Sequence, residues 1–238
     1  MDWLAHYEAN TELYVDAQRR WPSRRSRPGG KWILASFDDE SVIVYQAYND
    51  DIAKYACENG RFAGCLTYNE KRMTWIKTSF LWMMYRSNWA SRPNQQHILA
   101  IWLRRSAFDS YLARSNNSDT DELPSDSAVR LKGRVRLQWD PDHDPQGEPT
   151  IGRRAIQLGL RQVESFLDGR DIIRIVDISS FVRNQYTNAV LPKRRRGHDQ
   201  IDQLRIPVVN IYEPEDERIR RHIQLDLVEM TNNVNIFE

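Results

Sequence analysis

The order of apolar and polar residues predicts short strands and helices without a regular βαβ repeat. Runs rich in β-branched and aromatic residues predict strands at 32–37, 42–47, 97–103, 129–139, 154–160, 171–178 and 207–212. Helical spacing and capping residues predict helices at 2–20, 50–59, 80–85, 106–114 and 163–169, and another that begins near Pro214. This pattern predicts an α+β fold, a single domain with a mixed or mostly antiparallel sheet and flanking helices.

The 238 residues are expected to form one domain, since a domain usually has about 150 residues. Its expected parts are an N-terminal helix (1–20), an Arg- and Pro-rich loop (21–31), a core (32–180), a basic mobile loop (187–205) and a C-terminal strand, helix and tail (206–238). The N-terminus has no basic-then-apolar signal, and the longest apolar run, Phe80 to Tyr85, is far shorter than the ~18 residues of a membrane span. We expect a cytoplasmic protein that does not contact a membrane.

The sequence argues against several common chemistries. The motifs G-x-G-x-x-G, G-x-x-x-x-G-K-[ST], H-E-x-x-H, C-x-x-C and G-x-S-x-G are absent. Cys57 and Cys65 are too few to staple the chain with disulfides. The carboxylates of residues 140–144 have a spacing that suits a hard cation, but prolines at 141 and 145 and the missing twelfth-position Glu argue against a calcium loop. We therefore expect no metal site.

Charged residues occur in blocks, although the net charge is only +1. Residues 61–118 carry nine basic and two acidic side chains, residues 119–128 four acids, residues 129–139 four bases and residues 140–150 four acids. Arginine dominates, with 28 Arg against 6 Lys, and its guanidinium group forms bidentate contacts with carboxylates and phosphates. The near-zero sum therefore conceals separate positive and negative surfaces.

Two groups of residues are candidates for a site. The first surrounds the Trp- and Met-rich helix of segment 72–89 and comprises Arg72, Thr74, Lys77, Ser79, Tyr85, Arg86 and Ser87, joined by Tyr45 and Gln46 from a strand end. Either these are core residues whose cations extend to solvent, or they form a cationic pocket for a phosphate, a carboxylate or a developing oxyanion. The second group alternates with apolar residues or lies in the late basic loop: Arg130, Lys132, Arg134, Arg136, Lys193, Arg194, Arg195 and Arg196. Pairing with the acidic loops and binding of an RNA backbone both remain open for it.

Four segments resemble a known family: VYQAYNDDIAKYACENGRF, RMTWIKTSFLWMMYRSNW, QWDPDHD and RRAIQLGLR. They are similar, over roughly residues 32–180, to the family of domain of unknown function 4291, found in bacteria and fungi. Its typical forms of these segments are YQA followed by an IA helix, RMTWIKPSFLWMMYRSGW, QWDPER and RSIQIGL. The chain departs from them at Thr78, Asn88, Asp142-His143 and Arg154-Ala155.

Within that family, the chain resembles the fungal arginine-containing cyclodipeptide synthases, which use aminoacyl-tRNAs and release cyclo-(Arg-Xaa). The resemblance implies an aminoacyltransferase whose partners are arginyl-tRNA and a second aminoacyl-tRNA. It also implies that no cofactor is needed, because the aminoacyl ester already stores the activation. The site must then take a proton from an ammonium group, stabilise an oxyanion and hold the tRNA 3′ end.

The roles that follow from this resemblance are expectations. Catalysis is assigned to Tyr45, Arg72, Thr74, Lys77, Ser79, Tyr85 and Arg86, with Ser79 also a candidate covalent acyl acceptor. Substrate binding is assigned to Gln46, Asp38, Asp39, Gln138, Asp140, Arg153 and Gln157, with Asp140 the first choice for a guanidinium group. Binding of the tRNA backbone is assigned to Arg130, Lys132, Arg134, Arg136, Lys193, Arg194, Arg195 and Arg196.

Two other functions remain open. An NAD-dependent enzyme of the ADP-ribosyltransferase kind would use the strand 42–47, the helix after it, and nearby Tyr, Gln and Arg side chains, but the sequence lacks a clear late Glu. A non-catalytic RNA-binding module would use the cationic strand, and its tRNA binding would depend on salt without yielding a product.

Overall fold

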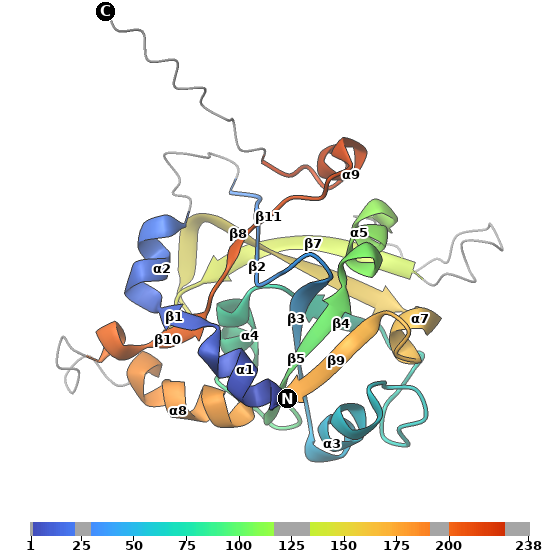
Figure 1. The fold of residues 1–238 in the computed structure, drawn as a ribbon, viewed down its shortest axis with the longest axis horizontal. Coiled ribbons are helices and arrows are strands. Elements are labelled where there is room, and N and C mark those ends of the chain that lie inside the picture. Colours follow the sequence, from blue (N-terminus) through green and yellow to red (C-terminus); the bar gives the residue numbers. More distant parts are fainter. Residues whose placement is uncertain (1, 22–29, 117–133, 191–199, 227–238) are drawn as a thin grey trace, which may run out of the picture.

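A seven-stranded mixed sheet organises the molecule, with strand order β6-β7-β8-β4-β3-β5-β9 (Figure 1). The computed structural model describes residues 2–21, 30–116, 134–190 and 200–226. All neighbouring strands are antiparallel except β6 and β7, which are parallel. The strands of this sheet are β3 (Ser41–Tyr48), β4 (Thr74–Lys77), β5 (His97–Arg104), β6 (Ser115–Asn116), β7 (Arg134–His143), β8 (Pro149–Arg161) and β9 (Ile172–Asp177).

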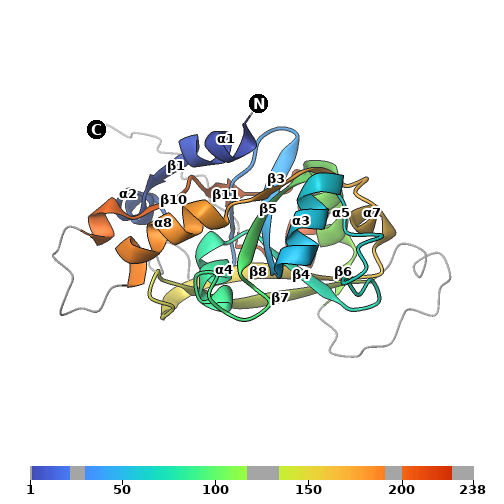
Figure 2. The ribbon, with the colours of Figure 1, turned by 90° about the horizontal axis from the view of Figure 1, so that it is seen from below.

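Helices cover the sheet on two sides (Figure 2). One hydrophobic cluster joins the sheet to α3 (Asp50–Asn59), α5 (Arg105–Ala113) and α7 (Glu164–Leu167). A second joins it to α1 (Trp3–Ala9), α2 (Tyr14–Arg20), α4 (Phe80–Ser87) and α8 (Ser179–Val190). The α+β class, the mostly antiparallel sheet and the flanking helices are therefore confirmed. Among the residues described, none of the helices has both the length and the apolar character that crossing a membrane would require.

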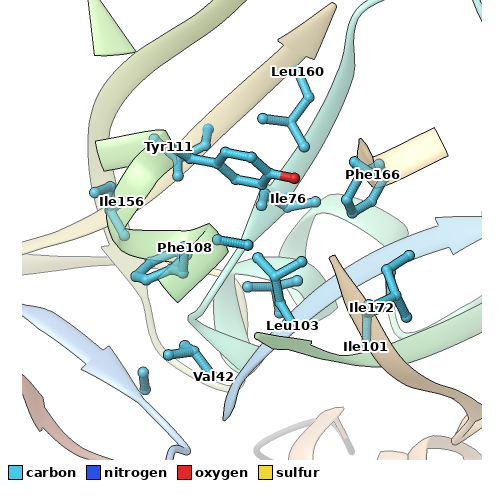
Figure 3. Close-up of a cluster of buried hydrophobic side chains, with 14 of the residues drawn as sticks. Val42, Ile76, Ile101, Leu103, Phe108, Tyr111, Ile156, Leu160, Phe166 and Ile172 are labelled. Carbon is cyan, nitrogen blue, oxygen red and sulfur yellow. The ribbon is translucent and has the colours of Figure 1, made fainter. Parts of the chain in front are cut away.

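Strand β5 shows why its sequence is a continuous apolar run. Leu99, Ile101 and Leu103 belong to the first hydrophobic cluster, whereas Ile98 and Trp102 belong to the second. A strand buried on both faces needs apolar residues at every position instead of an alternation. Figure 3 shows the first cluster, in which side chains from β3, β4, β5, β8 and β9 meet those of α5 and α7.

Two small antiparallel sheets join distant parts of the chain. Strand β1 (Thr11–Leu13) pairs with β10 (Arg205–Pro207), and β2 (Ile33–Ala35) pairs with β11 (Asn210–Tyr212). The short helices η1 (Ile201–Gln203) and α9 (Glu217–His222) flank these strands in sequence. The prediction of one helix over 2–20 is thus wrong. Leu13 falls near the helical spacing of Leu4, Tyr7 and Ala17, but the backbone of residues 11–13 pairs with β10, so tertiary pairing overrides local preference.

The structure corrects three further predictions. Residues 74–77 form strand β4, so Thr74 and Lys77 lie on a strand and not beside the helix of segment 72–89. Helix α4 begins at Phe80, with Ser79 as its N-cap. The polar residues 140–143 extend β7, because their backbone pairs with β8. Residues 179–190 form helix α8, so the expected loop 187–205 begins inside a helix. Residues 191–199 of that loop lie outside the described residues.

Candidate functional site

A cavity of about 620 Å³ lies where strands β3 and β4 separate. Among the described residues, the two strands are paired through Tyr45 and Lys77 alone. Beyond that pair, residues 46–49 and 72–75 line the cavity from its two sides. Helix α4 adds Trp82 and Arg86 to the wall, and β7 and β8 contribute two glutamines. The volume is in the range of about 300–1,000 Å³ that small-molecule sites usually have.

The wall of this cavity is basic, rich in amides and aromatic. Its cations are Arg72, Lys77 and Arg86, and none of the described residues that line it is acidic. Its aromatic side chains are Tyr48, Tyr68, Trp75 and Trp82, and its glutamines are Gln46, Gln95, Gln138 and Gln157. Arg72 and Arg86 are exposed and Lys77 is buried. Such a cationic wall favours an anion or a carbonyl oxygen that gains negative charge.

Lys77 is the one buried cation among these three. Its side chain is buried, and its Nζ donates a hydrogen bond of 3.1 Å to the backbone oxygen of Trp75. The same nitrogen lies 4.8 Å from the ring centroid of Trp82. The pKa of Lys77 is lowered to about 7, chiefly by burial and secondly by repulsion from Arg86, while Asp140 opposes both effects. A substantial fraction of this amine is therefore uncharged at neutral pH.

A polar bridge spans the opening between β3 and β4. Gln46 donates from Nε2 to Oγ1 of Thr74 at 2.6 Å and to the backbone oxygen of Trp75 at 3.3 Å. The hydroxyl of Tyr48 lies 2.8 Å from the same Thr74 oxygen. Burial raises the pKa of Tyr48 well above its usual value, so this hydroxyl stays protonated at neutral pH.

Asp140 lies behind the wall of the cavity, beside Lys77. Gln157 donates from Nε2 to the Asp140 carboxylate and to Oε1 of Gln138, the latter at 3.1 Å. Burial raises the pKa of Asp140, while Lys77 acts in the opposite direction. Gln138 and Gln157 face the cavity and Asp140 does not, so the carboxylate acts on the site through Lys77 and Gln157.

The structure separates Ser79 and Arg153 from this cavity. Ser79 donates to Asp142 at 2.8 Å and caps α4, and Arg153 donates from Nε to the other oxygen of Asp142. The guanidinium group of Arg153 stacks 4.5 Å from the centroid of Trp21. Ser79, Asp142 and Trp21 line a void of about 20 Å³, which has room for roughly one water molecule.

Two predicted catalytic tyrosines also point elsewhere. Tyr45 is fully buried, and its hydroxyl lies 3.1 Å from that of Tyr7. Burial raises the pKa of Tyr45, and its ring packs edge-on against Phe80. Tyr85 is exposed and stacks on His143 with ring centroids 3.7 Å apart. Neither tyrosine lines the cavity, which supports the alternative that Tyr45 is a core residue.

The remaining predicted residues are dispersed. Asp38 accepts from the backbone of Glu40 and Ser41 in the turn before β3 and lines a separate cavity of about 290 Å³, and Asp39 is exposed in the same turn. Arg134 is buried and Arg136 half-buried on β7, and both interact within the protein. Six residues of the basic group lie outside the described residues: Arg130, Lys132, Lys193, Arg194, Arg195 and Arg196.

The structure therefore brings together Gln46, Arg72, Thr74, Lys77, Arg86, Gln138 and Gln157 at one cavity. It adds lining residues that the sequence analysis missed, among them Tyr48, Trp82 and Gln95. Tyr48 follows Gln46 by two positions, so strand periodicity was a usable signal for it. No motif marks Gln95. Within the described residues, no three His, Cys, Asp or Glu side chains are grouped so that they could hold a metal ion.

The fold and the site define a class of α+β protein with a mixed sheet. Two central strands of this sheet, β3 and β4, move apart and leave a basic, amide-lined cavity between them. The model of the family described as Domain of unknown function (DUF4291) matches residues 32–212, so the chain belongs to this family. The matched region contains every described residue of the cavity wall. A search of curated proteins found no match.

Proposed function

We propose that this protein is an aminoacyltransferase that uses aminoacyl-tRNAs and releases cyclo-(Arg-Xaa) diketopiperazines. The observation that carries the proposal is Lys77, a buried amine in a basic cavity with its pKa lowered to about 7. Acyl transfer to an amine needs a base that is free near neutral pH and a cation near the reacting carbonyl. Lys77 meets the first need, and Arg72 and Arg86 meet the second.

In the first step, the amino group of one aminoacyl ester attacks the carbonyl carbon of the other. Lys77 takes the proton that the attacking ammonium group must lose, and Arg86 and Arg72 stabilise the negative charge on the carbonyl oxygen. The new C–N bond forms as the C–O bond to the tRNA ribose breaks. Lys77 releases this first proton to solvent, then takes the second proton that the attacking nitrogen loses and delivers it to the leaving ribose oxygen. The step therefore releases one proton to water overall.

In the second step, the free amine of the dipeptidyl ester attacks its own ester carbonyl. The reaction closes a six-membered ring and releases the second tRNA, with the same exchange of a proton through Lys77. Because both groups are on one molecule, proximity supplies much of the acceleration. Tyr48, Thr74 and Gln46 hydrogen-bond to one another and fix the polar surface of the same wall.

The arginine side chain requires a carboxylate, and Asp140 is the acidic group that acts on Lys77. We assign the preference for a guanidinium group to the negative charge of Asp140, which acts from behind the part of the wall formed by Gln138 and Gln157. Replacement of Asp140 by Asn should selectively lower the use of arginyl-tRNA. Unchanged selectivity for arginine would contradict this assignment.

The test is mass spectrometry of small molecules released when the purified protein is mixed with total tRNA, synthetases, ATP and labelled arginine, with and without ribonuclease. A ribonuclease-sensitive cyclo-(Arg-Xaa) mass is expected. Lys77→Met and Lys77→Arg should both lose it, because neither side chain accepts a proton at neutral pH, and Lys54→Met on exposed α3 should keep it. Absence of product from the wild type, with arginyl-tRNA present, would favour the NAD-dependent or RNA-binding functions.

A further inference from the structure

Two glutamine side chains of the cavity have amide oxygens with no hydrogen-bond partner among the described residues. Oε1 of Gln46 is buried on a side chain that is only 3% exposed, and Oε1 of Gln95 is buried as well. The Nε2 of Gln46 is already fixed by Thr74 and Trp75, which sets the direction of its oxygen. A buried acceptor without a partner costs free energy, so such groups usually serve a ligand or an ordered water. A ligand that satisfies these two acceptors must carry N–H or O–H donors.

Gln95 follows a backbone segment in an unusual conformation. Asn88, Trp89 and Ala90 have φ values of 49°, 53° and 64°, and Asn94 has 61°. Non-glycine residues in this region are strained, and such strain persists where the surrounding structure enforces it, often beside ligands. Here Trp89 donates from Nε1 to the backbone oxygen of Pro145 at 3.1 Å, which anchors the segment. The backbone thus holds Gln95 at the cavity wall.

The other groups of the wall restrict the ligand further. Trp75, Trp82, Tyr48 and Tyr68 offer aromatic surface, on which nucleobases stack. Arg72 and Arg86 offer charge for a phosphate. A ligand that brings N–H donors, a flat ring and a phosphate together is a nucleotide. The amide of a glutamine pairs with adenine by accepting from the N6 amine and donating to N7.

We propose that the cavity binds an adenosine nucleotide, with Gln95 contacting the amine edge of adenine and Gln46 accepting a second hydrogen bond from the ligand. Adenine fits better than cytosine, because a cavity of about 620 Å³ with four aromatic side chains suits a two-ring base. The adenosine can come from the 3′ end of a tRNA or from NAD. The assignment of this adenosine to tRNA rests on the proposed function. The contact between adenine and Gln95 is independent of that function.

The experiment titrates AMP, IMP and CMP into the full chain and follows tryptophan fluorescence, since Trp75 and Trp82 line the cavity. IMP has an oxygen in place of the N6 amine, so AMP should bind at least about tenfold more tightly. Gln95→Leu should lower the affinity for AMP to that for IMP, and Gln96→Leu, at the exposed neighbour, should not change it. Equal affinities for AMP and IMP, affinity for CMP equal to that for AMP, or no binding of AMP would each overturn the proposal, even if Gln95→Leu fails to fold.

Two further arms separate the sources of the adenosine. If tRNA is the source, intact tRNA should displace AMP at least about tenfold better than tRNA that lacks its terminal adenosine. Displacement by NAD together with equal competition by the two tRNAs would assign the adenosine to NAD. Preference for AMP without any cyclo-(Arg-Xaa) would contradict the proposed function alone, and cyclo-(Arg-Xaa) formation without a preference for AMP would contradict the adenine contact alone.

Discussion

The hydroxyl of Ser79 donates a hydrogen bond of 2.8 Å to Oδ1 of Asp142. Ser79 precedes the first turn of α4, and its oxygen also accepts from the backbone N–H of Trp82 at 3.2 Å. The other oxygen of Asp142 accepts from Arg153 on β8. One chain of hydrogen bonds therefore ties the start of the helix that carries Arg86 to two strands of the sheet. The hydroxyl is occupied by this structural role.

Replacement of Ser79 by Ala should destabilise the protein by about 1–2 kcal/mol, because the helix loses its cap and Asp142 loses a donor. Urea unfolding measures the loss. Ser180→Ala, at an exposed serine in the first turn of α8, is the matched control and should change stability by less than about 0.5 kcal/mol. Because Ser79 does not line the large cavity, no acyl group should be found on it by intact mass spectrometry of quenched reactions. An acyl adduct present in the wild type and absent from the alanine variant would show that Ser79 is a nucleophile.

The buried ion pair of Arg153 and Asp142 predicts that removing one partner costs more stability than removing both. Their side chains are 7% and 5% exposed, so Arg153→Met leaves a buried carboxylate without its cation and should cost about 3–5 kcal/mol. Arg153→Met combined with Asp142→Leu should cost less than Arg153→Met alone. The exposed pair of Arg170 and Asp168 is the control, and Arg170→Met should cost no more than about 1 kcal/mol. Similar losses from the two single Arg variants in chemical denaturation would be the contrary result.

Lys77 predicts a particular dependence of stability on pH. Its pKa is about 7 in the folded protein and ~10.4 in an unfolded chain, so between these values the unfolded state binds more protons. The free energy of unfolding should therefore rise with pH across this window, by up to about 1.4 kcal/mol per pH unit from this group. Below pH 7 the lysine is charged in both states, and the full burial penalty applies.

Lys77→Met removes this contribution. The variant should be more stable than the wild type near pH 7, and its advantage should shrink as the pH rises to 9. Urea unfolding of both proteins at pH 7, 8 and 9 tests this, with Lys54→Met at an exposed lysine as the control. Parallel stability profiles for the wild type and Lys77→Met would show that the pKa of Lys77 is not lowered.

The left-handed segment after α4 predicts a stabilising substitution. Ala90 has a φ of 64°, a conformation that glycine adopts without steric cost. Ala90→Gly should raise the free energy of unfolding by about 0.5–1 kcal/mol. Ala5→Gly, at an exposed position inside α1, should instead lower it by a similar amount, because glycine weakens a helix interior. The melting temperatures of the two variants should therefore shift in opposite directions. A loss of stability in both variants would show that the backbone at Ala90 is not strained.

Several elements could be predicted because their causes are local. Helix α3 begins after Asn49, whose side chain accepts from the backbone of Ile52, and ends at Gly60 with a φ of 66°. Both residues are recognisable cap signals in the sequence. Strand β5 and the apolar helix after Ser79 could also be predicted, because an element buried on all sides has a continuous run of hydrophobic residues. These elements were sufficient to predict the α+β class.

The sequence by itself also determined which residue types were available to a site, and it pointed to Lys77, Arg72, Arg86 and Gln46. Only the tertiary structure decided which of them meet. Tyr45 and Gln46 are neighbours in the chain, yet one lies in the core and the other at the cavity, because successive side chains of a strand face opposite sides. The pairing of β1 with β10, the separation of β3 from β4 and the place of Gln95 depend on contacts between residues far apart in the chain. The lowered pKa of Lys77 has the same origin, since burial and the charges of Arg86 and Asp140 are properties of the packed protein and not of its local sequence.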